Sequence, residues 1–311
     1  MFTEEHLKHH SNYKIGGKAA HFFSFRTIPE AIEAAQKAKE IGKPIFILGG
    51  GTNILFGDKG WDGVVLKNEI DAFEVLDGNR LRVGGGVPID RILKITIERG
   101  LSGLEWAGGL PGTLGGAIRG NAGAFMGETK YSIVEVTSLR IGNGESQIVH
   151  RDNKECTFAY RSSVFKTEHP DEIVLEATLQ FTPGNRDEIE KAIQEKIEYR
   201  KTRHPIDLPN IGSIFKNIDL KDIPEEFQKK FAHVIKKDPF PVLPTAFLIS
   251  EAGLKGTRHG GAEISGRHPN FIVNTGNATA SDVKYLIALV KKTIKEKFHI
   301  DLEEEIVYIE R

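Results

Sequence analysis

Gly108-Gly109-Leu110-Pro111-Gly112-Thr113-Leu114-Gly115-Gly116-Ala117 is the stretch that decides the fold of this chain, and Asn121-Ala122-Gly123-Ala124 follows it closely. The sixteen residues from Gly108 to Gly123 contain seven of the 33 glycines. Flexible linkers are polar, whereas the residues between these glycines are mostly apolar. We therefore expect buried backbone that lies against a flat ligand, where side chains would collide.

A second glycine turn occurs earlier in the chain. Ile45–Leu48 is a short apolar run typical of a buried strand, and it leads directly into Gly49-Gly50-Gly51-Thr52-Asn53. Glycines after a strand can leave backbone N–H groups free to bind an anion such as phosphate. The turn is neither a Walker loop nor the Gly-x-Gly-x-x-Gly fingerprint. Alone it fits a plain tight turn equally well, but the two loops together suit a dinucleotide.

Hydrophobic periodicity predicts helices and strands in mixed order. Thr27-Ile-Pro-Glu30 has the pattern of a capped helix start, with Glu30 reaching back, and Gly42 ends that helix. Strands whose sheet has one solvent-exposed face are expected at Ile133–Ile141, Gln147–His150 and Ile173–Thr182, and Asn79–Val83 precedes the second predicted helix. That helix is amphipathic and spans Ile89–Arg99, closed by Gly100. A charged helix is expected over Asp187–Thr202, and one with an apolar stripe over Ser281–Phe298, capped by Ser281.

Composition narrows the function classes. The 311 residues carry a formal net charge of -1, so no overall field attracts nucleic acid or an anionic membrane. Cys156 is the only cysteine, which excludes an internal disulfide and favours a reducing compartment. No run of 18 apolar residues and no signal-peptide pattern occurs, so a cytoplasmic protein is expected. His6, His9 and His10 share their spacing with no carboxylate or cysteine, so we expect no metal and a solvated N-terminal segment.

Several motifs carry a family resemblance. Ile15-Gly16-Gly17, the Leu48–Asn53 turn and Gly103-Leu104-Glu105 resemble the FAD-binding domain of vanillyl-alcohol-oxidase-type flavoproteins. Within that group the chain is most similar to the UDP-N-acetylenolpyruvoylglucosamine reductase family, from about residue 9 to residue 309. Three separated motifs follow the family order: Tyr160-Arg161-Ser162, Gly212-Ser213-Ile214-Phe215-Lys216-Asn217 and Leu302-Glu303-Glu304-Glu305-Ile306.

The resemblance implies an α+β fold in three parts. Two FAD-binding subdomains would span residues 1–66 and 67–205, and a substrate-binding domain would span residues 206–303. A strand over 304–311 could return to the second subdomain. The two prolines Pro205 and Pro209 also predict a boundary there.

The resemblance also implies the cofactors. FAD would be bound by the two glycine loops, and NADPH would donate the electrons. The implied cofactor-binding residues are Gly49, Gly50, Gly51, Thr52, Asn53, Ile54, Gly108, Leu110, Pro111, Gly112, Thr113, Gly115, Gly116, Asn121, Ala122 and Gly123.

In the reaction that the family implies, hydride passes through the flavin N5 to C3 of an enolpyruvyl sugar nucleotide, and a proton is added at C2. Arg161 would hold the substrate carboxylate and the growing enolate charge, because a guanidinium is a permanent cation with a fork of donors. Ser213 matches the family's proton donor, and Glu305 matches its acidic partner. Glu305 is chosen over Glu303 because it directly precedes Ile306, as in the family motif.

Substrate contacts are implied at three further positions. Lys216, Asn217 and Lys255 align with residues that hold the diphosphate and the sugar. The implied partners are therefore small molecules, a UDP-sugar enolpyruvyl ether and NADPH, and a monomer is expected.

Two features depart from the family pattern. The better-known form of the enzyme has a mobile loop with a tyrosine, but no tyrosine occurs here between Tyr199 and Tyr285. Instead Asp219–Pro244 is extra length, in which we predict a short helix over Pro224–Lys236 that shields the substrate cleft or elaborates the surface. Arg119 stands beside the flavin loop where an apolar residue is expected. It could reach a flavin phosphate or form a salt bridge.

Two other functions would explain the glycine loops. A hydroxy-acid oxidase on the same flavin fold would explain the loops equally well, but it would not explain why Arg161, Ser213 and Glu305 all occur in their family motifs. A non-catalytic flavin-binding module would need no proton donor at all.

Overall fold

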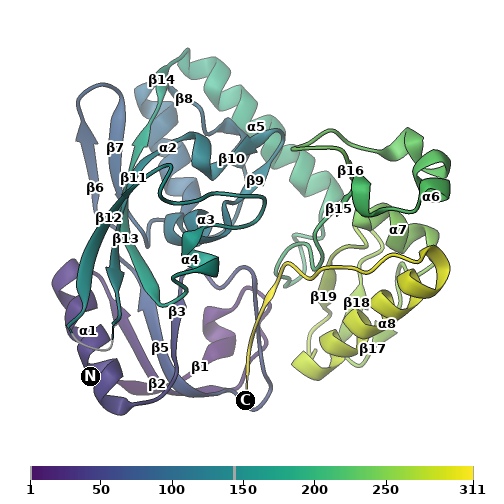
Figure 1. Ribbon diagram of the computed structural model, residues 1–311, viewed down its shortest axis with the longest axis horizontal. Helices are drawn as coiled ribbons and strands as arrows, with labels where there is room; N and C mark the ends of the chain where they lie inside the picture. Colours follow the sequence, from purple (N-terminus) through teal and green to yellow (C-terminus); the bar gives the residue numbers. More distant parts are fainter. Residues whose placement is uncertain (1, 143–144, 311) are drawn as a thin grey trace. The chain divides into compact units, whose positions relative to one another are not determined.

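The structure is a computed structural model that describes residues 2–142 and 145–310. The chain forms two units, each built from several separate segments (Figure 1). Unit 1 comprises Met1–Glu5, Ala19–Gly50 and Asp62–Tyr199, and unit 2 comprises His6–Lys18, Gly51–Trp61 and Arg200–Arg311. The division into three domains stays a prediction.

One layer of unit 1 is a four-stranded sheet in the order β1-β2-β5-β3. Helix α1 packs against it through four buried alanines, whose small side chains let the helix approach Val64 and Leu66. Strands β3 and β5 run parallel, and β3 ends at the first glycine turn. The bounds are β1 (Thr3–His6), β2 (Lys18–Phe25), α1 (Ile28–Ile41), β3 (Ile45–Leu48) and β5 (Trp61–Asn68).

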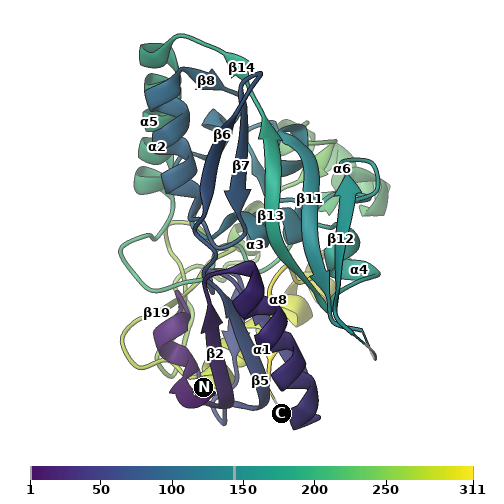
Figure 2. The ribbon, with the colours of Figure 1, turned by 90° about the vertical axis from the view of Figure 1, so that its left-hand side faces the viewer.

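The second layer of unit 1 is a five-stranded antiparallel sheet, whose strands β6, β7, β13, β11 and β12 lie side by side in Figure 2. Helices α2, α3 and α5 share a core with one face of this sheet. Leu139, Ile173 and Leu175 belong to the other core, beneath α1. The predicted solvent-exposed face is therefore wrong for the central strand β13, because apolar cores cover both of its faces.

The bounds of these elements are β6 (Phe73–Leu76), β7 (Arg80–Gly84), α2 (Ile89–Arg99), α3 (Leu114–Gly120), β11 (Ile133–Arg140), β12 (Gln147–Asp152), α4 (Val164–Thr167), β13 (Glu172–Gln180) and α5 (Arg186–Arg203). Short elements complete unit 1: β8 (Leu101–Ser102), η2 (Glu105–Ala107), β9 (Gly123–Ala124), β10 (Gly127–Glu128), η3 (Thr129–Tyr131) and β14 (Thr182–Pro183).

Unit 2 is built around α8 (Ala280–Phe298), whose apolar stripe is buried against the sheet β17-β18-β19 and α7. Strand β20 pairs in parallel with β4, which joins the end of the chain to the segment after the first glycine turn. The other elements are η1 (Leu7–His10), β4 (Ile54–Phe56), β15 (Ile218–Asp219), η4 (Leu220–Asp222), α6 (Glu225–Lys230), η5 (Ala232–Val234), β16 (Val242–Leu243), α7 (Thr245–Glu251), β17 (Arg258–His259), β18 (Ala262–Ile264), β19 (Ile272–Asn274) and β20 (Val307–Ile309).

The expectation of a solvated N-terminal segment is wrong in part: Lys8 and His9 are exposed, but other residues of the segment are not. Leu7 and Tyr13 are fully buried, and the Tyr13 hydroxyl donates to the Ile272 carbonyl at 2.7 Å. Leu7, between the histidines, and Tyr13, after them, anchor this segment in unit 2, because apolar side chains gain free energy from burial.

Helix ends follow the sequence signals with two exceptions. The Thr27 hydroxyl caps α1, and Gly42 and Gly100 end α1 and α2 in the left-handed conformation, as predicted. The Glu30 carboxylate, however, accepts from the Arg26 N–H rather than from Thr27. The predicted cap of α8 is also wrong. Thr279 and Asp282 form its capping box, whereas the hydroxyl of Ser281 donates to Asp58.

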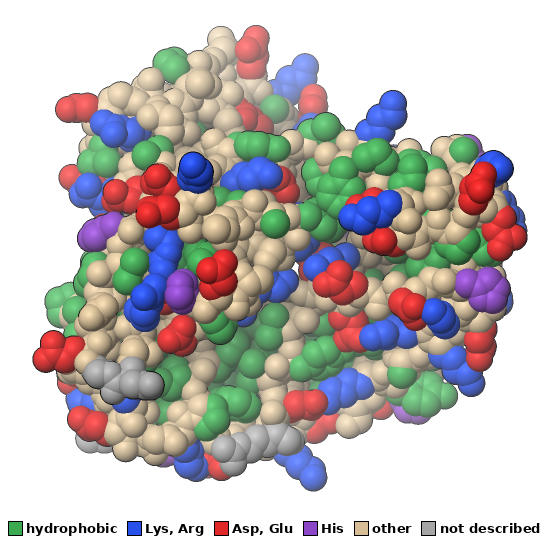
Figure 3. Space-filling model, viewed as in Figure 1, with side chains coloured by type: hydrophobic (Ala, Val, Ile, Leu, Met, Phe, Trp, Pro, Cys, Tyr) green, Lys and Arg blue, Asp and Glu red, His purple; other side chains and the backbone are tan. Residues whose placement is uncertain are grey.

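The distribution of charged side chains on the surface is consistent with the small net charge of the chain. On the face drawn in Figure 3, cationic and anionic side chains are interspersed rather than gathered by sign. Among the helices of residues 2–142 and 145–310, none combines the length and the apolarity needed to cross a bilayer. Those residues also contain no group of three or more His, Cys, Asp or Glu side chains arranged to hold a metal ion.

Candidate active site

The two predicted glycine loops meet in unit 1. A Cβ atom placed on Gly50 would lie 2.9 Å from the Cα of Gly112, and one on Gly49 would lie 2.7 Å from Oγ1 of Thr113. Real Cβ atoms do not approach other atoms this closely, so a side chain at Gly50 would displace the Gly112 backbone and one at Gly49 would displace the Thr113 hydroxyl. The absence of side chains lets loops that are distant in sequence pack backbone against backbone.

The remaining glycines of the second loop serve two different purposes. Glycine is needed at Gly108 because a Cβ there would lie 2.5 Å from the Ile193 carbonyl, and it relieves a tight contact at Gly115, where a Cβ would lie 3.0 Å from the Gly85 carbonyl. Gly116 is exposed, and the nearest atom to its Cβ position is Oγ1 of Thr113 at 3.7 Å. Between them, Leu110 packs against the core and Pro111 is exposed. Protein packing explains the first two glycines, and open space remains beside Gly116.

Thr113 carries a polar atom that the protein leaves unsatisfied. Its Oγ1 is buried and has no hydrogen-bond partner among the described residues, and it does not cap α3. A buried hydroxyl without a partner costs about 1–3 kcal/mol, so such a group is expected to bind something else. A hydroxyl at this position, beside the glycines of both loops, fits the phosphate or ring edge of a dinucleotide such as FAD.

The rest of the first glycine turn belongs to unit 2. Gly51 adopts φ +64°, and a Cβ there would lie 1.9 Å from the His10 carbonyl. The half-buried Thr52 follows, and Ile54 begins β4. The amide Nδ2 of Asn53 donates to the Glu305 carbonyl at 3.1 Å. Asn53, predicted to bind the cofactor, thus also fixes the backbone of a predicted catalytic residue.

Arg161 lies in a tight turn of unit 1. Ala159 and Ser162 exchange backbone hydrogen bonds of 3.0 and 3.1 Å around Tyr160 and Arg161. Arg161 has φ +54°, a conformation that costs a non-glycine residue about 1–2 kcal/mol. Its Nη2 donates to the Gly123 carbonyl at 2.8 Å, and its guanidinium lies 4.9 Å from the Tyr160 ring. Backbone strain of this kind clusters at functional sites, which makes the turn a candidate site.

Asn121 connects the flavin loop to that turn. It is fully buried with φ +41°, and its Nδ2 donates to the Ala159 carbonyl at 3.0 Å. Its Oδ1 accepts from the Lys130 N–H at 3.1 Å. Ala122 accepts from Thr129, and Gly123 accepts from Arg161. Two of the predicted cofactor residues, Asn121 and Gly123, therefore also hold the Arg161 turn in place.

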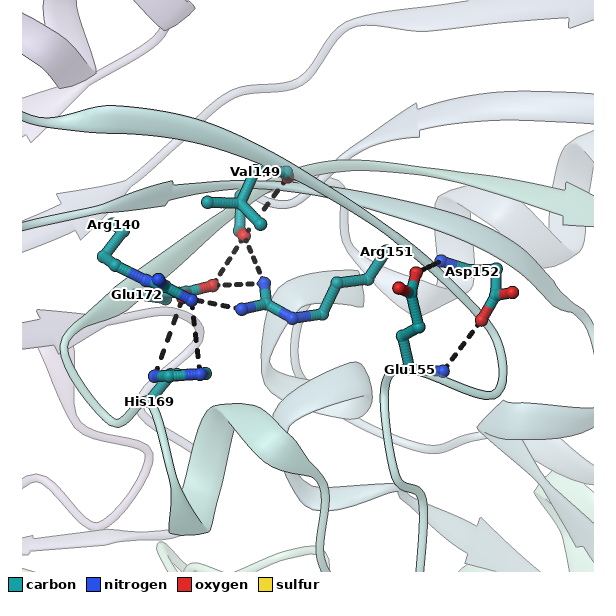
Figure 4. Close-up of polar contacts among 8 residues, drawn as sticks. Arg140, Val149, Arg151, Asp152, Glu155, His169 and Glu172 are labelled. Carbon is teal, nitrogen blue, oxygen red and sulfur yellow. Dashed lines mark hydrogen bonds and ion pairs between the residues drawn. The ribbon is translucent and has the colours of Figure 1, made fainter.

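A buried ionic network lies at the base of the connection that carries this turn (Figure 4). Arg151 donates to both carboxylate oxygens of Glu172 at 2.6 and 2.9 Å, and Arg140 and Ser138 donate to it at 2.7 Å. Burial alone would raise the pKa of Glu172, but these donors outweigh it and the pKa lies below its usual value. The ion pair between Arg151 and Glu172 joins the two ends of the segment over residues 153–171. Within that segment, burial raises the pKa of Cys156 to about 12, which makes its thiol inert.

Ser213 and Glu305 come together in unit 2. Phe215 and Glu304 form an antiparallel bridge, in which the Glu305 N–H donates to the Ile214 carbonyl at 2.8 Å and the Lys216 N–H donates to the Glu303 carbonyl at 2.9 Å. The Ser213 and Glu305 residues are half-buried. Two motifs far apart in the sequence are thus joined by main-chain hydrogen bonds.

The predicted substrate residues have different surroundings within unit 2. Lys216 forms an ion pair with the exposed carboxylate of Glu303. Asn217 accepts from the Thr245 N–H at 3.3 Å, next to the same backbone segment. Lys255 is exposed in the turn after α7.

Sequence reasoning missed Asn270. It is buried, and its amide donates to the Phe215 carbonyl at 2.8 Å and accepts from the Phe215 N–H at 3.0 Å. A polar Asn inside the apolar run Pro269-Asn270-Phe271-Ile272-Val273 was the available signal, because buried amides are normally hydrogen-bonded. Asn270 holds the segment that presents Ser213.

A histidine pair beside Asn270 was also missed. The rings of His204 and His268 lie 5.1 Å apart, edge to face, and both contact Phe271. Burial, with smaller contributions from His268 and Arg200 at His204 and from Lys236 and Lys255 at His268, lowers the pKa of each ring to about 4. Both histidines are therefore neutral at pH 7.

The extra segment Asp219–Pro244 forms α6 and η5, which confirms a helix within the predicted range, although a shorter one. Phe231 is buried, and its ring lies 5.8 Å from Phe227 and 5.1 Å from Phe247 of α7. Phe227 also contacts Phe298 at the end of α8. The aromatic side chains of the segment thus extend the core of unit 2.

Comparisons with known proteins agree with these features. Residues 19–150 match the family model described as FAD binding domain, and residues 204–309 match the model described as UDP-N-acetylenolpyruvoylglucosamine reductase, C-terminal domain. The chain is 38% identical to UDP-N-acetylenolpyruvoylglucosamine reductase from Bacillus licheniformis over 99% of this chain and 94% of that protein. The corresponding enzyme from Caldanaerobacter subterraneus is 36% identical over 98% and 92%.

A solved structure has the same fold. The crystal structure of UDP-N-acetylenolpyruvylglucosamine reductase from Thermus caldophilus superposes with a TM-score of 0.78 and 28% identity, over 99% of this chain and 98% of that one. The fold and the glycine loops thus define an FAD-binding flavoprotein of α+β architecture, as the sequence predicted. More narrowly, the chain belongs to the UDP-N-acetylenolpyruvoylglucosamine reductase family.

Proposed function

We propose that this protein uses NADPH to reduce UDP-N-acetylglucosamine enolpyruvate to UDP-N-acetylmuramate, a step of peptidoglycan precursor synthesis. Membership of the family supports the reaction. One structural observation carries the chemistry: the hydrogen bond from the Glu305 N–H to the Ile214 carbonyl, which brings the backbone of the predicted acid next to that of the predicted proton donor Ser213.

FAD, when bound, supplies the reducing chemistry by taking a hydride from NADPH and delivering one to C3 of the enolpyruvyl group. The residues of the chain manage the charge that this leaves on the substrate. Arg161 would bind the substrate carboxylate and stabilise the negative charge shared between that group and C2, because its guanidinium stays cationic and offers a fork of donors.

Ser213 would then give its hydroxyl proton to C2, and Glu305 would steady the enol form or relay the proton. A serine is a weak acid, so a cation close to its alkoxide would assist it. Lys216 lies three residues further along the same segment and is the nearest cation in sequence. Together with Asn217 and Lys255, it would hold the diphosphate and the sugar.

The absorption spectrum of the purified protein tests both halves of the reaction. NADPH should bleach a bound flavin, and under anaerobic conditions only the enolpyruvyl substrate should restore its colour. Oxygen consumption with a hydroxy acid, without NADPH turnover, would show an oxidase instead. A flavin that NADPH never bleaches would contradict any NADPH-dependent reductase.

The variant Ser213→Ala separates the two half-reactions. Bleaching by NADPH should be unchanged, while recovery with substrate should slow by about 10²–10⁴-fold, the usual contribution of a general acid. Equal loss of both steps would contradict the assigned role of Ser213.

We further propose that the protein acts as a monomer in the cytoplasm. A single cysteine is typical of a reducing compartment. Sedimentation analysis at several protein concentrations would give one species of about 34.5 kDa, and a species of twice that mass would contradict a monomer.

A further inference from the structure

Arg119 is a cation that the protein itself leaves unpaired. It stands in the last turn of α3, and its guanidinium has no hydrogen bond, ion pair or aromatic contact within residues 2–142 and 145–310. Yet the residue is only half-exposed, and burial lowers the pKa of its side chain. Removing a charge from water without a counter-charge is costly, so an unpaired arginine in such a position needs an explanation.

The position of Arg119 on α3 places it on the open face of that helix. Leu114, Ala117 and Ile118 are the buried residues of α3, and Gly116, Arg119 and Gly120 occupy the opposite face. Outside the backbone of α3 itself, no atom lies within 4 Å of a Cβ placed on Gly120, and the nearest atom to one placed on Gly116 is Oγ1 of Thr113 at 3.7 Å. A large cationic side chain thus stands between two glycines that leave space for a ligand.

The backbone of Arg119 is tied to the Arg161 turn. The Ser163 hydroxyl donates to the Arg119 carbonyl at 2.8 Å, and Asn121, two residues further on, holds the Ala159 carbonyl. Figure 1 shows α3 beside α4, the helix that follows this turn, and the two helices are in contact. The open face of α3 therefore belongs to the same part of unit 1 as the residue proposed to bind the substrate carboxylate.

We propose that Arg119 binds an oxyanion of a ligand at the reaction site, either a phosphate of bound FAD or a carboxylate or phosphate of the nucleotide-sugar substrate. The inference rests on the proposed function for the identity of these ligands. A guanidinium binds both kinds of oxyanion through charge-assisted hydrogen bonds, so one side chain suits either source. The salt-bridge alternative for Arg119 finds no carboxylate partner among the described residues.

Two binding measurements distinguish the sources, each made on wild type, Arg119→Gln, Arg119→Lys and Arg99→Gln. Arg99 is the matched control, because it is also a basic residue in the last turn of a helix of unit 1 but is exposed. The first measurement titrates flavin-free protein with FAD and follows flavin fluorescence. The second titrates the FAD-loaded protein with the enolpyruvyl substrate and follows the flavin spectrum.

If Arg119 binds FAD, Arg119→Gln weakens FAD binding by about 10- to 100-fold, the value of a charge-assisted hydrogen bond. If it binds the substrate, the same loss occurs in the second titration while FAD affinity stays within about twofold. Arg119→Lys should recover part of either loss, because it keeps the charge but not the fork. Rising salt should weaken the affected binding step more in wild type than in Arg119→Gln.

The inference is overturned if Arg119→Gln matches Arg99→Gln within about twofold in both titrations. Circular dichroism of each variant separates this result from misfolding, and Arg119→Lys provides a folded variant if Arg119→Gln is unstable. Failure of the proposed function would give a different result, because wild-type protein would then bind FAD but not the enolpyruvyl substrate. The FAD titration would still test the role of Arg119.

Discussion

Two buried asparagines hold the two segments that carry the proposed catalytic residues. In unit 1, Asn121 donates to Ala159 and accepts from Lys130, and so fixes the turn of Arg161. In unit 2, Asn270 donates to and accepts from the backbone of Phe215, two residues after Ser213. Both amides use donor and acceptor together, which is how a buried asparagine is satisfied.

The two segments differ in their backbones. The Arg161 turn includes a non-glycine residue at φ +54°, and Asn121 itself has φ +41°. The Ser213 segment is held by a main-chain bridge to residues 303–305 in addition to Asn270. The first segment is closed by its own backbone hydrogen bonds, but side chains of Asn121 and Arg161 tie it to the flavin loop. The second is tied to a distant segment by backbone hydrogen bonds as well, which most side-chain substitutions leave in place. Function should therefore be more sensitive to supporting mutations around Arg161 than around Ser213.

The largest effect is expected at Arg161 itself. Arg161→Ala should lower kcat/KM by about 10²–10³-fold, because it removes the donor to the developing oxyanion. Arg161→Lys should recover only part of the loss, since an ammonium cannot form the same fork. Steady-state kinetics with the enolpyruvyl substrate measures this, and FAD content serves as the control. A loss below about threefold in Arg161→Ala would contradict its role.

A smaller effect is expected at the two asparagines, and it should differ between them. Asn121→Gly keeps a residue suited to positive φ but removes the amide, so Arg161 should shift and kcat should fall about tenfold. Asn270→Ala leaves buried groups of Phe215 unsatisfied, which costs about 1–3 kcal/mol of stability, yet the main-chain bridge remains and kcat should stay within about threefold.

Thermal unfolding and steady-state kinetics on both variants make this test. Equal losses of kcat in Asn121→Gly and Asn270→Ala would show that the contrast between strained and bridged segments has no functional consequence.

The sequence predicts regular elements and local motifs well. Helix α2 and its Gly100 cap occur at the predicted residues, and β11 and β13 differ from prediction only by one or two residues at their ends. These signals are local, because periodicity and capping depend on residues a few positions apart. The site motifs around Arg161, Ser213 and Glu305 were found through the family resemblance. Local rules of periodicity and capping do not single out these residues.

Long-range packing was not predictable in the same way. The burial of both faces of β13 depends on α1, more than a hundred residues earlier in the chain, and the role of Asn270 depends on Phe215. Glycines at Gly108 and Gly116 look alike in sequence, but one is required by Ile193 and the other faces open space. Such distinctions arise from tertiary contacts, to which propensity and spacing are insensitive.

As the pH falls, the region of unit 2 around Ser213 and Asn270 should lose stability before the region of unit 1 around Arg161. The pKa of His204 and of His268 is about 4 in the folded protein, below the usual 6.5, so the unfolded chain binds more protons between these values. Stability is therefore complete above about pH 6.5 and falls towards pH 4, by less than about 1.4 kcal/mol per pH unit for each histidine. Lys236, Lys255 and Arg200 are the cations near this pair.

In unit 1 the buried carboxylate behaves differently. The pKa of Glu172 lies below 4.5, so its contribution is lost only when the pH falls below that value. Amide hydrogen exchange at pH 7 and pH 5, corrected for intrinsic rates, should show faster opening around Asn270 but not around Glu172. His268→Asn should reduce this pH dependence. Equal acceleration in the two regions would contradict the assignment to the histidines.

The smallest effect is expected at Glu303. Substitutions there and at Glu305 test which glutamate of the run Glu303-Glu304-Glu305 has the acidic role. Glu303 is exposed and pairs with Lys216, and exposed ion pairs contribute at most about 1 kcal/mol. Glu303→Gln should therefore leave kcat within about threefold and stability nearly unchanged, whereas Glu305→Gln should slow flavin recovery with substrate strongly. Both residues lie on the same bridged segment, so the substitutions disturb the same backbone. If Glu303→Gln slowed that recovery more than Glu305→Gln, the acidic role would belong to Glu303, and the motif position that favoured Glu305 would be the wrong guide.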